Sequence, residues 1–258
     1  MHYQTLRSVA SNGIATITLD RPDVKNALNT QMRAELTHAI LQAGRSARVV
    51  VLTGNGDAFC SGQDLGDAKN LAHTDLERIL RDEYEPMLRA ISDCPVPVIA
   101  AVNGAAAGAG ASLALACDVV VAAERAIFMQ AFTKIGLMPD AGATYALPRQ
   151  MGMAKAMGAA LFADRITARQ ASDWGMIWEA LPDEEFAEGW KARAQHLADG
   201  PSIAYANIKQ AIRQSWGNSY EQQLTAEAQL QGMCGNTRDY KEGVLAFSEK
   251  RKPSFEGR

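Results

Sequence analysis

The feature that most constrains this chain is an uncharged run, PVPVIAAVNGAAAGAGASLALAC, at 95–117. It is long enough to cross a bilayer. However, two prolines open it, Asn103 interrupts it, and its second half is mostly alanine and glycine. We therefore interpret the run as a buried strand, a tight turn and a buried helix, and we expect no membrane partner.

The composition supports a large apolar core. The chain has 258 residues, of which 47% are hydrophobic, so we expect one main domain with a helical appendage. The net charge of −3 provides no basic field for nucleic acid. The four cysteines form no C-x-x-C pair and the N-terminus has no apolar signal core, so no zinc site, disulfide framework or export is expected. A cytoplasmic location fits best.

Hydrophobic periodicity predicts an α/β chain. Strand patterns occupy 13–20, 48–54, 96–104, 118–124 and 175–181, with loops at 21–29 and 55–65. Helical patterns occupy 30–47, 74–92 and 108–117, and later 140–162, 167–173, 183–199, 201–216, 219–234 and 236–250. Strands and helices thus alternate in the first half, while helices dominate the last third.

Two glycine-bearing loops each follow a buried strand, GNGDAFCSGQDL after 49–53 and NGAAAGAGASL after 98–102. Such turns expose backbone N–H groups to a ligand. Neither loop has the third glycine of a dinucleotide fingerprint or the Gly-Lys-Ser/Thr of a P-loop. Taken singly, either loop could equally be a tight packing site.

Five motifs together resemble the crotonase, or enoyl-CoA hydratase/isomerase, superfamily. They are RPDVKNALN (21–29), FCSGQDL (59–65), VNGAAAGAGASLALACDVVVAAERAIF (102–128), KIGLMPDAGATYALPR (134–149) and EGVLAFSEKRKPSF (242–255). The resemblance implies a spiral of β-β-α units over 1–200 and a C-terminal helical oligomerisation region over 201–258. It also implies an acyl-CoA substrate and a homotrimer or a dimer of trimers.

The same resemblance assigns the residues of a site. Two backbone N–H groups, of Gln63 and Ala109, would hold the oxyanion of a thioester enolate. Coenzyme A would be part of the substrate, and no metal or other cofactor would be needed. The residues matched to its binding are Lys25, Ala27, Leu28, Ser61, Asp64, Phe247 and Lys250, the last two often contributed by a neighbouring subunit. For Lys25 and Lys250, the competing interpretation is a solvated surface lysine.

The departure from the family pattern concerns the acids. Hydratases of the superfamily use two glutamates, whose positions here are Ser112 and Phe132. Asp140 stands where those hydratases have glycine, and a few isomerases of the superfamily have aspartate there. One acid suits a proton shuttle, and apolar neighbours would raise its pKa. Without the resemblance, Asp140 would be interpreted as an N-cap of the helix that follows.

The expected function is therefore an acyl-CoA isomerase with Asp140 as its acid and base. The substrate would be a 3-enoyl-CoA or a ring-1,2-epoxyphenylacetyl-CoA, as in isomerases of phenylacetate degradation. The acyl pocket would be formed by Ser112, Phe132, Leu137 and Tyr84.

Two rival functions stay open. A hydratase would need another acid, for which Glu83 and Glu85 are the candidates, and a non-catalytic homologue would bind CoA or RNA. Asp118 is interpreted as a turn or network residue. No histidine falls in a motif, so none of His2, His38, His73 and His196 is expected to be catalytic.

Overall fold

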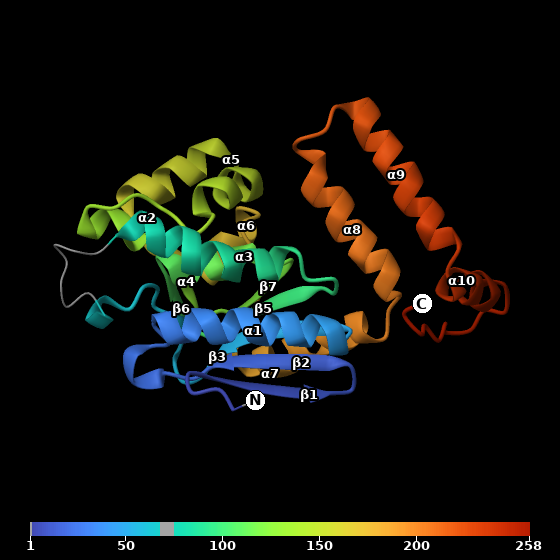
Figure 1. The fold of residues 1–258 in the computed structure, drawn as a ribbon, viewed down its shortest axis with the longest axis horizontal. Helices are drawn as coiled ribbons and strands as arrows, with labels where there is room; N and C mark the ends of the chain where they lie inside the picture. Colours follow the sequence, from blue (N-terminus) through green and yellow to red (C-terminus); the bar gives the residue numbers. More distant parts are fainter. Residues whose placement is uncertain (1, 68–74) are drawn as a thin grey trace.

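The structure is a computed structural model that describes residues 2–67 and 75–258 (Figure 1). It contains a six-stranded and a four-stranded sheet. The larger sheet has the order β1 (Leu6–Ser11), β2 (Ile14–Leu19), β3 (Val49–Gly54), β5 (Val98–Val102), β7 (Val119–Ala123) and β10 (Glu179–Leu181). Its strands are parallel except for β1, which pairs antiparallel with β2.

The smaller sheet is built from very short strands. Its order is β4 (Ala58–Cys60), β6 (Ala105–Ala107), β8 (Ile127–Met129) and β9 (Ile166–Thr167). The pairs β4–β6 and β6–β8 are parallel. Residues 55–65 were predicted to be a loop, and the strands β1, β4, β6, β8 and β9 were not predicted from the sequence. Of these, β4, β6, β8 and β9 have only two or three residues, too few to show alternation, and Ala105–Ala107 has no side chain with a preference for strands. In β1 only Leu6 is buried, so its six residues show no alternation of buried and exposed positions.

The two sheets are linked by a repeated path. The chain runs from β3 to β4, from β5 to β6 and from β7 to β8, so each long strand is followed by a short one. Helices α4 (Ala109–Ala116) and α5 (Ala143–Phe162) follow the second and third pairs. This is the expected spiral of β-β-α units, and the α/β class is confirmed.

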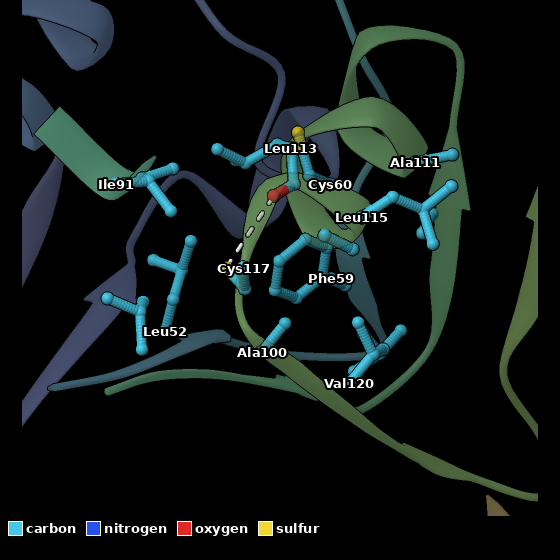
Figure 2. Close-up of a cluster of buried hydrophobic side chains, with 14 of the residues drawn as sticks. Leu52, Phe59, Cys60, Ile91, Ala100, Ala111, Leu113, Leu115, Cys117 and Val120 are labelled. Carbon is cyan, nitrogen blue, oxygen red and sulfur yellow. Dashed lines mark hydrogen bonds between the residues drawn. The ribbon is translucent and has the colours of Figure 1, made fainter. Parts of the chain in front are cut away.

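The large sheet is covered on both faces. Val49 and Val51 point to a cluster completed by Phe186 of α7 (Asp183–Ala198), while Val50 and Leu52 point to the main core. Figure 2 shows part of that core, in which Phe59 of β4 lies among side chains of α4 and of the large sheet. The predicted strand 48–54 is present as β3, and its apolar residues 49–52 are buried on both faces of the sheet.

The predicted N-terminal helices are present with adjusted bounds. Helix α1 (Thr30–Ser46) is capped by the Asn29 side chain, which accepts a hydrogen bond from the Met32 N–H. The predicted helix 74–92 consists of α2 (Leu76–Ile79), a π-helical turn (Leu80–Tyr84) and α3 (Glu85–Ser92). Position 74 of that prediction, and His73, lie outside the described residues.

The last third of the chain is helical, as expected. After α6 (Ala168–Asp173) and α7 come α8 (Ser202–Ser215), α9 (Tyr220–Gly235) and α10 (Arg238–Ser248). Helix α8 is tied to the sheet region through Asp118, which forms ion pairs with Lys209 and Arg213 at 2.7 Å each. Figure 1 shows α9 and α10 lying further from the sheets. The boundary between residues 200 and 201 stays a prediction.

The uncharged run 95–117 forms β5, β6 and α4, in agreement with the buried strand, turn and helix expected from its sequence. No helix in the described part of the chain is both long and apolar enough to span a bilayer.

Glycine permits the close contact between α4 and β4. A Cβ atom on Gly110 would lie 2.2 Å from the Cys60 carbonyl oxygen, whereas a Cβ on Gly232 of α9 would meet nothing within 4 Å. We predict that Gly110→Ala destabilises the fold by about 1–3 kcal/mol, and that Gly232→Ala is neutral or stabilises by up to ~1 kcal/mol. Urea unfolding of both variants tests this prediction, and equal effects would contradict it.

Candidate active site

The two glycine loops meet in space because their short strands are neighbours. Strands β4 and β6 pair in parallel, with Cys60 opposite Ala106, so both carboxyl ends lie at the same edge. A Cβ on Gly62 would lie 2.7 Å from the Ala107 carbonyl oxygen and 3.3 Å from the Ala109 nitrogen. Gly62 also has φ of +97°, which disfavours a side chain. The loop after β4 therefore lies directly against the start of α4.

The orientation of the Gln63 peptide follows from an isolated parallel bridge with Leu28. The Leu28 N–H donates to the Gly62 carbonyl at 2.8 Å, and its carbonyl accepts from the Asp64 N–H at 3.1 Å. In this pairing the middle residue, Gln63, turns its own N–H away from Leu28. No acceptor for that N–H is recorded in the described part of the chain.

The Ala109 N–H is available for a different reason. Ala109 is the first residue of α4, and the first N–H groups of a helix have no partner within it. The preceding Gly108 has φ of +51° and ψ of −126° and donates its N–H to the Met129 carbonyl at 2.8 Å. The N–H groups of Gln63 and Ala109, hereafter the donor pair, thus belong to backbone segments in contact. Chemically, such a pair can bind one anionic oxygen.

Asp140 does not cap the helix that follows it. The predicted first residue of this helix, 140, was wrong, because α5 begins at Ala143. Its N-cap is Gly142, which has φ of +84° and provides no side-chain cap. The hydrogen bonds of Asp140 are made by its main-chain carbonyl, which accepts from the Ala143 N–H and from the Ser112 hydroxyl. The carboxylate has no hydrogen-bonding partner among the described residues. Burial raises its pKa to about 6.

Asp140 lies next to the helix that provides the Ala109 N–H. The hydroxyl of buried Ser112 is 3.1 Å from the Asp140 carbonyl oxygen, and the Ser112 N–H donates to the Gly108 carbonyl. A cavity of about 1080 Å³ extends between α3, α4, α5 and α8, and its lining includes Tyr84, Ser112 and Ala141. The main chain of Asp140 therefore contacts α4, and the next residue, Ala141, lines this cavity.

Of the four predicted acyl-pocket residues, Tyr84 and Ser112 line this cavity, whereas Phe132 and Leu137 do not. Phe132 is buried beside the start of α4, because a Cβ on Gly108, the residue before Ala109, would lie 3.9 Å from the tip of its ring. Leu137 is 36% exposed. Burial raises the pKa of Tyr84, and nearby Cys60 and Asp140 raise it further, whereas Arg33 opposes the shift. The Tyr84 hydroxyl therefore lies within range of the Asp140 charge.

Most of the residues matched to coenzyme A lie together beside the donor pair. The Ser61 N–H donates to the Lys25 carbonyl at 2.9 Å, and Leu28 forms the bridge with Gln63. Ala27 is buried and accepts a hydrogen bond from Arg21 through its carbonyl, while the Lys25 side chain is exposed. The segment 25–28 and the loop after β4 therefore form one continuous surface.

Asp64 braces this surface. Arg21 donates to its carboxylate at 2.7 Å, and the Gly66 N–H donates at 2.9 Å. Burial opposes ionisation of Asp64, but these hydrogen bonds and the Arg21 charge outweigh it and lower the pKa. Asp64 is therefore ionised and committed to the loop.

Phe247 and Lys250 are not part of this surface in the same chain. Phe247 of α10 is 87% exposed. Figure 1 shows α10 at the opposite end of the molecule from the start of α1, which follows Lys25 and Leu28. A single chain therefore does not bring the two predicted groups of coenzyme A contacts together.

The other candidate acids, Glu83 and Glu85, form ion pairs with arginines. Arg33 pairs with Glu83 at 2.6 Å, and Arg89 pairs with Glu85 at 2.7 Å. Burial alone would raise the pKa of Glu83, but the hydrogen bond and charge of Arg33 outweigh it and lower the pKa. Asp118 is a network residue, as expected. His38 is within 2.9 Å of the Tyr3 hydroxyl.

Arg33 lies beside the site and was not predicted from the sequence. Its side chain is 2% exposed and contacts Leu28, Gln63 and Glu83. A signal was present, because Arg33 lies three and seven residues before Leu36 and Ile40 on the apolar face of α1. A charged residue at a core-facing position requires internal partners.

Comparison with known proteins identifies the family. The enoyl-CoA hydratase/isomerase family model matches residues 9–258. A "Probable enoyl-CoA hydratase" of Rhodobacter capsulatus is 60% identical, with full coverage of both chains. The 1,2-epoxyphenylacetyl-CoA isomerase of Escherichia coli is 44% identical over 97% of this chain and 98% of its own.

Solved structures agree with these sequence matches. The crystal structure of an enoyl-CoA hydratase from Bacillus anthracis superposes with a TM-score of 0.90 at 32% identity, covering 99% of this chain and 100% of that one. Sequence and fold thus match over the whole length. The chain belongs to the enoyl-CoA hydratase/isomerase family of the crotonase superfamily.

Proposed function

We propose that this enzyme is an acyl-CoA isomerase in which Asp140 moves the proton and the donor pair holds the thioester oxyanion. The main support for the proposal is the environment and the pKa of the Asp140 carboxylate. Its carboxylate is half-buried, has no hydrogen-bonding partner among the described residues and has a pKa raised to about 6. Such a group is a stronger base than an ordinary aspartate and can also return the proton.

For a 3-enoyl-CoA the reaction balances with these groups alone. The Asp140 carboxylate removes a proton from C2, and the electrons of that C–H bond move into the thioester, giving a dienolate. The N–H groups of Gln63 and Ala109 stabilise its negative oxygen. Protonated Asp140 then delivers the proton to C4, which leaves a conjugated 2-enoyl-CoA and regenerates the carboxylate. The scheme needs no metal or redox cofactor.

We further propose which acyl group the substrate carries. The relative from Escherichia coli is named for a ring epoxide of phenylacetyl-CoA, so that substrate and a 3-enoyl-CoA are the two candidates. Ser112, whose hydroxyl contacts the Asp140 carbonyl, has a small side chain, which is compatible with a cyclic acyl group. Degradation of aromatic or fatty acids in the cytoplasm is the setting in which either substrate would arise.

Hydration is the rival, and the name of the Rhodobacter capsulatus relative favours it. Water addition requires one group to orient and deprotonate water and another to deliver a proton. The candidates for a second acid, Glu83 and Glu85, are paired with Arg33 and Arg89. This pairing supports isomerisation over hydration.

The proposed assembly is a homotrimer or a dimer of trimers. Phe247 and Lys250 cannot reach the segment 25–28 of their own chain in this fold, and α10 leaves several apolar side chains exposed. A neighbouring copy that supplies these residues would complete the coenzyme A site and cover that apolar surface.

Asp140→Asn should slow isomerisation of a 3-enoyl-CoA by at least ~100-fold, because the amide cannot accept the C2 proton. Proton NMR in deuterated water would follow the double-bond shift and any exchange, with both candidate substrates. Asp199→Asn, at an exposed position after α7, is the matched control and should retain activity. A near-normal rate in Asp140→Asn would overturn the role of Asp140. Hydration of a 2-enoyl-CoA as fast as isomerisation would favour the rival function.

The raised pKa of Asp140 predicts two pH effects. The value of kcat/KM should rise with pH to a plateau, with its midpoint near 6, because only the carboxylate is the base. Folding should show the opposite sign, since a raised carboxyl pKa means that ionisation costs stability. The Tm difference between Asp140→Asn and the parent should therefore be small near pH 4, grow as pH rises to about 6, and then stay constant. A pH-independent Tm difference would contradict the assigned pKa.

Phe247→Ala should weaken coenzyme A binding about tenfold if a neighbouring copy uses this ring, since a buried aromatic contact is typically worth more than ~1 kcal/mol. Calorimetry measures the affinity, and Phe162→Ala, another exposed phenylalanine, is the control. Sedimentation should give a mass of three or six chains. A monomer that binds coenzyme A at full affinity would contradict this assembly.

A further inference from the structure

Arg33 is the most completely bonded buried charge beside the candidate active site. Its Nη1 donates to the Leu28 carbonyl at 2.6 Å and to the Gln63 Oε1 at 3.0 Å. Its Nε and Nη2 donate to Glu83 Oε2 at 3.0 and 2.6 Å, and Nη2 also reaches the Thr30 hydroxyl at 3.1 Å. The guanidinium carbon lies 4.9 Å from the centre of the Tyr84 ring. One side chain thus joins three separate segments.

Two of these segments define the peptide that presents one of the N–H donors. The Leu28 carbonyl, which Arg33 holds, is the same atom that accepts from the Asp64 N–H. The Gln63 side chain is held from two directions, by Arg33 and by the Tyr84 hydroxyl, which donates to Oε1 at 2.5 Å. With both the bridge partner and the side chain of Gln63 fixed, its peptide has little freedom to rotate.

The third segment is the π-helical turn that carries Glu83 and Tyr84. A π-helical turn inserts an extra residue and is frequent near functional sites. Here it turns Glu83 toward Arg33 and Tyr84 toward Gln63. Tyr84, which lines the cavity, is therefore linked to Gln63 directly by its hydroxyl and also through the Arg33 guanidinium, which contacts both residues.

We propose that Arg33 is a positioning residue that sets the orientation of the Gln63 N–H donor and aligns it with the wall formed by Tyr84. This inference rests on the proposed function, since it assumes that the donor pair holds the oxyanion. Arginine suits the task because its planar fork donates in several fixed directions at once. Lysine would retain the charge opposite Glu83 and lose the fixed geometry toward Leu28 and Gln63.

The test compares Arg33→Lys with Arg48→Lys. Arg48 also donates to two carbonyls, of Gly200 at 2.6 Å and Phe255 at 3.1 Å, but does not contact the site. Both variants should lose some thermal stability. Only Arg33→Lys should lower kcat, by about 10- to 100-fold, with KM changing much less, because a misaligned donor fails mainly in the transition state.

A spectroscopic measurement separates positioning from a general structural effect. Acetoacetyl-CoA has a thioester enolate that absorbs in the near ultraviolet, and an aligned donor pair should lower its apparent pKa when bound. That pKa should move back toward the free value in Arg33→Lys and stay as in the parent in Arg48→Lys. The double variant Arg33→Met with Glu83→Gln leaves no unpaired buried charge, and it provides the same measurement if Arg33→Lys folds poorly.

The outcomes of these experiments are distinguishable. Folded Arg33 variants with parental kcat and parental enolate pKa would overturn the role of Arg33, even if the enzyme is an isomerase. A parent enzyme that binds acetoacetyl-CoA with no lowering of its pKa and isomerises neither candidate substrate would instead overturn the proposed function.

Discussion

The candidate site depends on the parallel pairing of two three-residue strands, β4 and β6. This pairing places the loop after β4 against the first turn of α4, so that the peptides of Gln63 and Ala109 adjoin. Its geometry leaves no space for side chains at Gly62 and Gly110, where an added Cβ would meet the carbonyl oxygens of Ala107 and Cys60. The glycines are therefore required by close backbone contact, and the exposed N–H groups follow from it.

The carboxyl groups around this backbone arrangement have pKa values shifted in opposite directions. Asp64 and Glu83 each have an arginine partner that outweighs the effect of burial and lowers the carboxyl pKa. Asp140 has no such partner among the described residues, so burial raises its pKa to about 6. Because acids and bases work best when their pKa is near the working pH, Asp140 is suited to transfer a proton and the paired acids are suited to maintain structure.

The resemblance of sequence motifs anticipated much of this arrangement, and its limits have physical causes. The long strands and amphipathic helices were predictable because their burial imposes a period on the sequence. The strands β4, β6 and β8 were not, because three residues are too few to establish a period, and their pairing is set by neighbours far along the chain. Arg33 was missed because its partners Gln63 and Glu83 are distant in sequence.

The sequence by itself determined the family, the α/β class and the identity of the one unusual acid, since these depend on residue types in a fixed order along the chain. Whether the Asp140 side chain caps a helix was decided only by the tertiary structure. Gly142, which has a positive φ, is the N-cap of α5. The Asp140 carboxylate is half-buried and has no hydrogen-bonding partner among the described residues. The outcome depends on the backbone path of residues 140–142, which is set by the packing of α5 against α4.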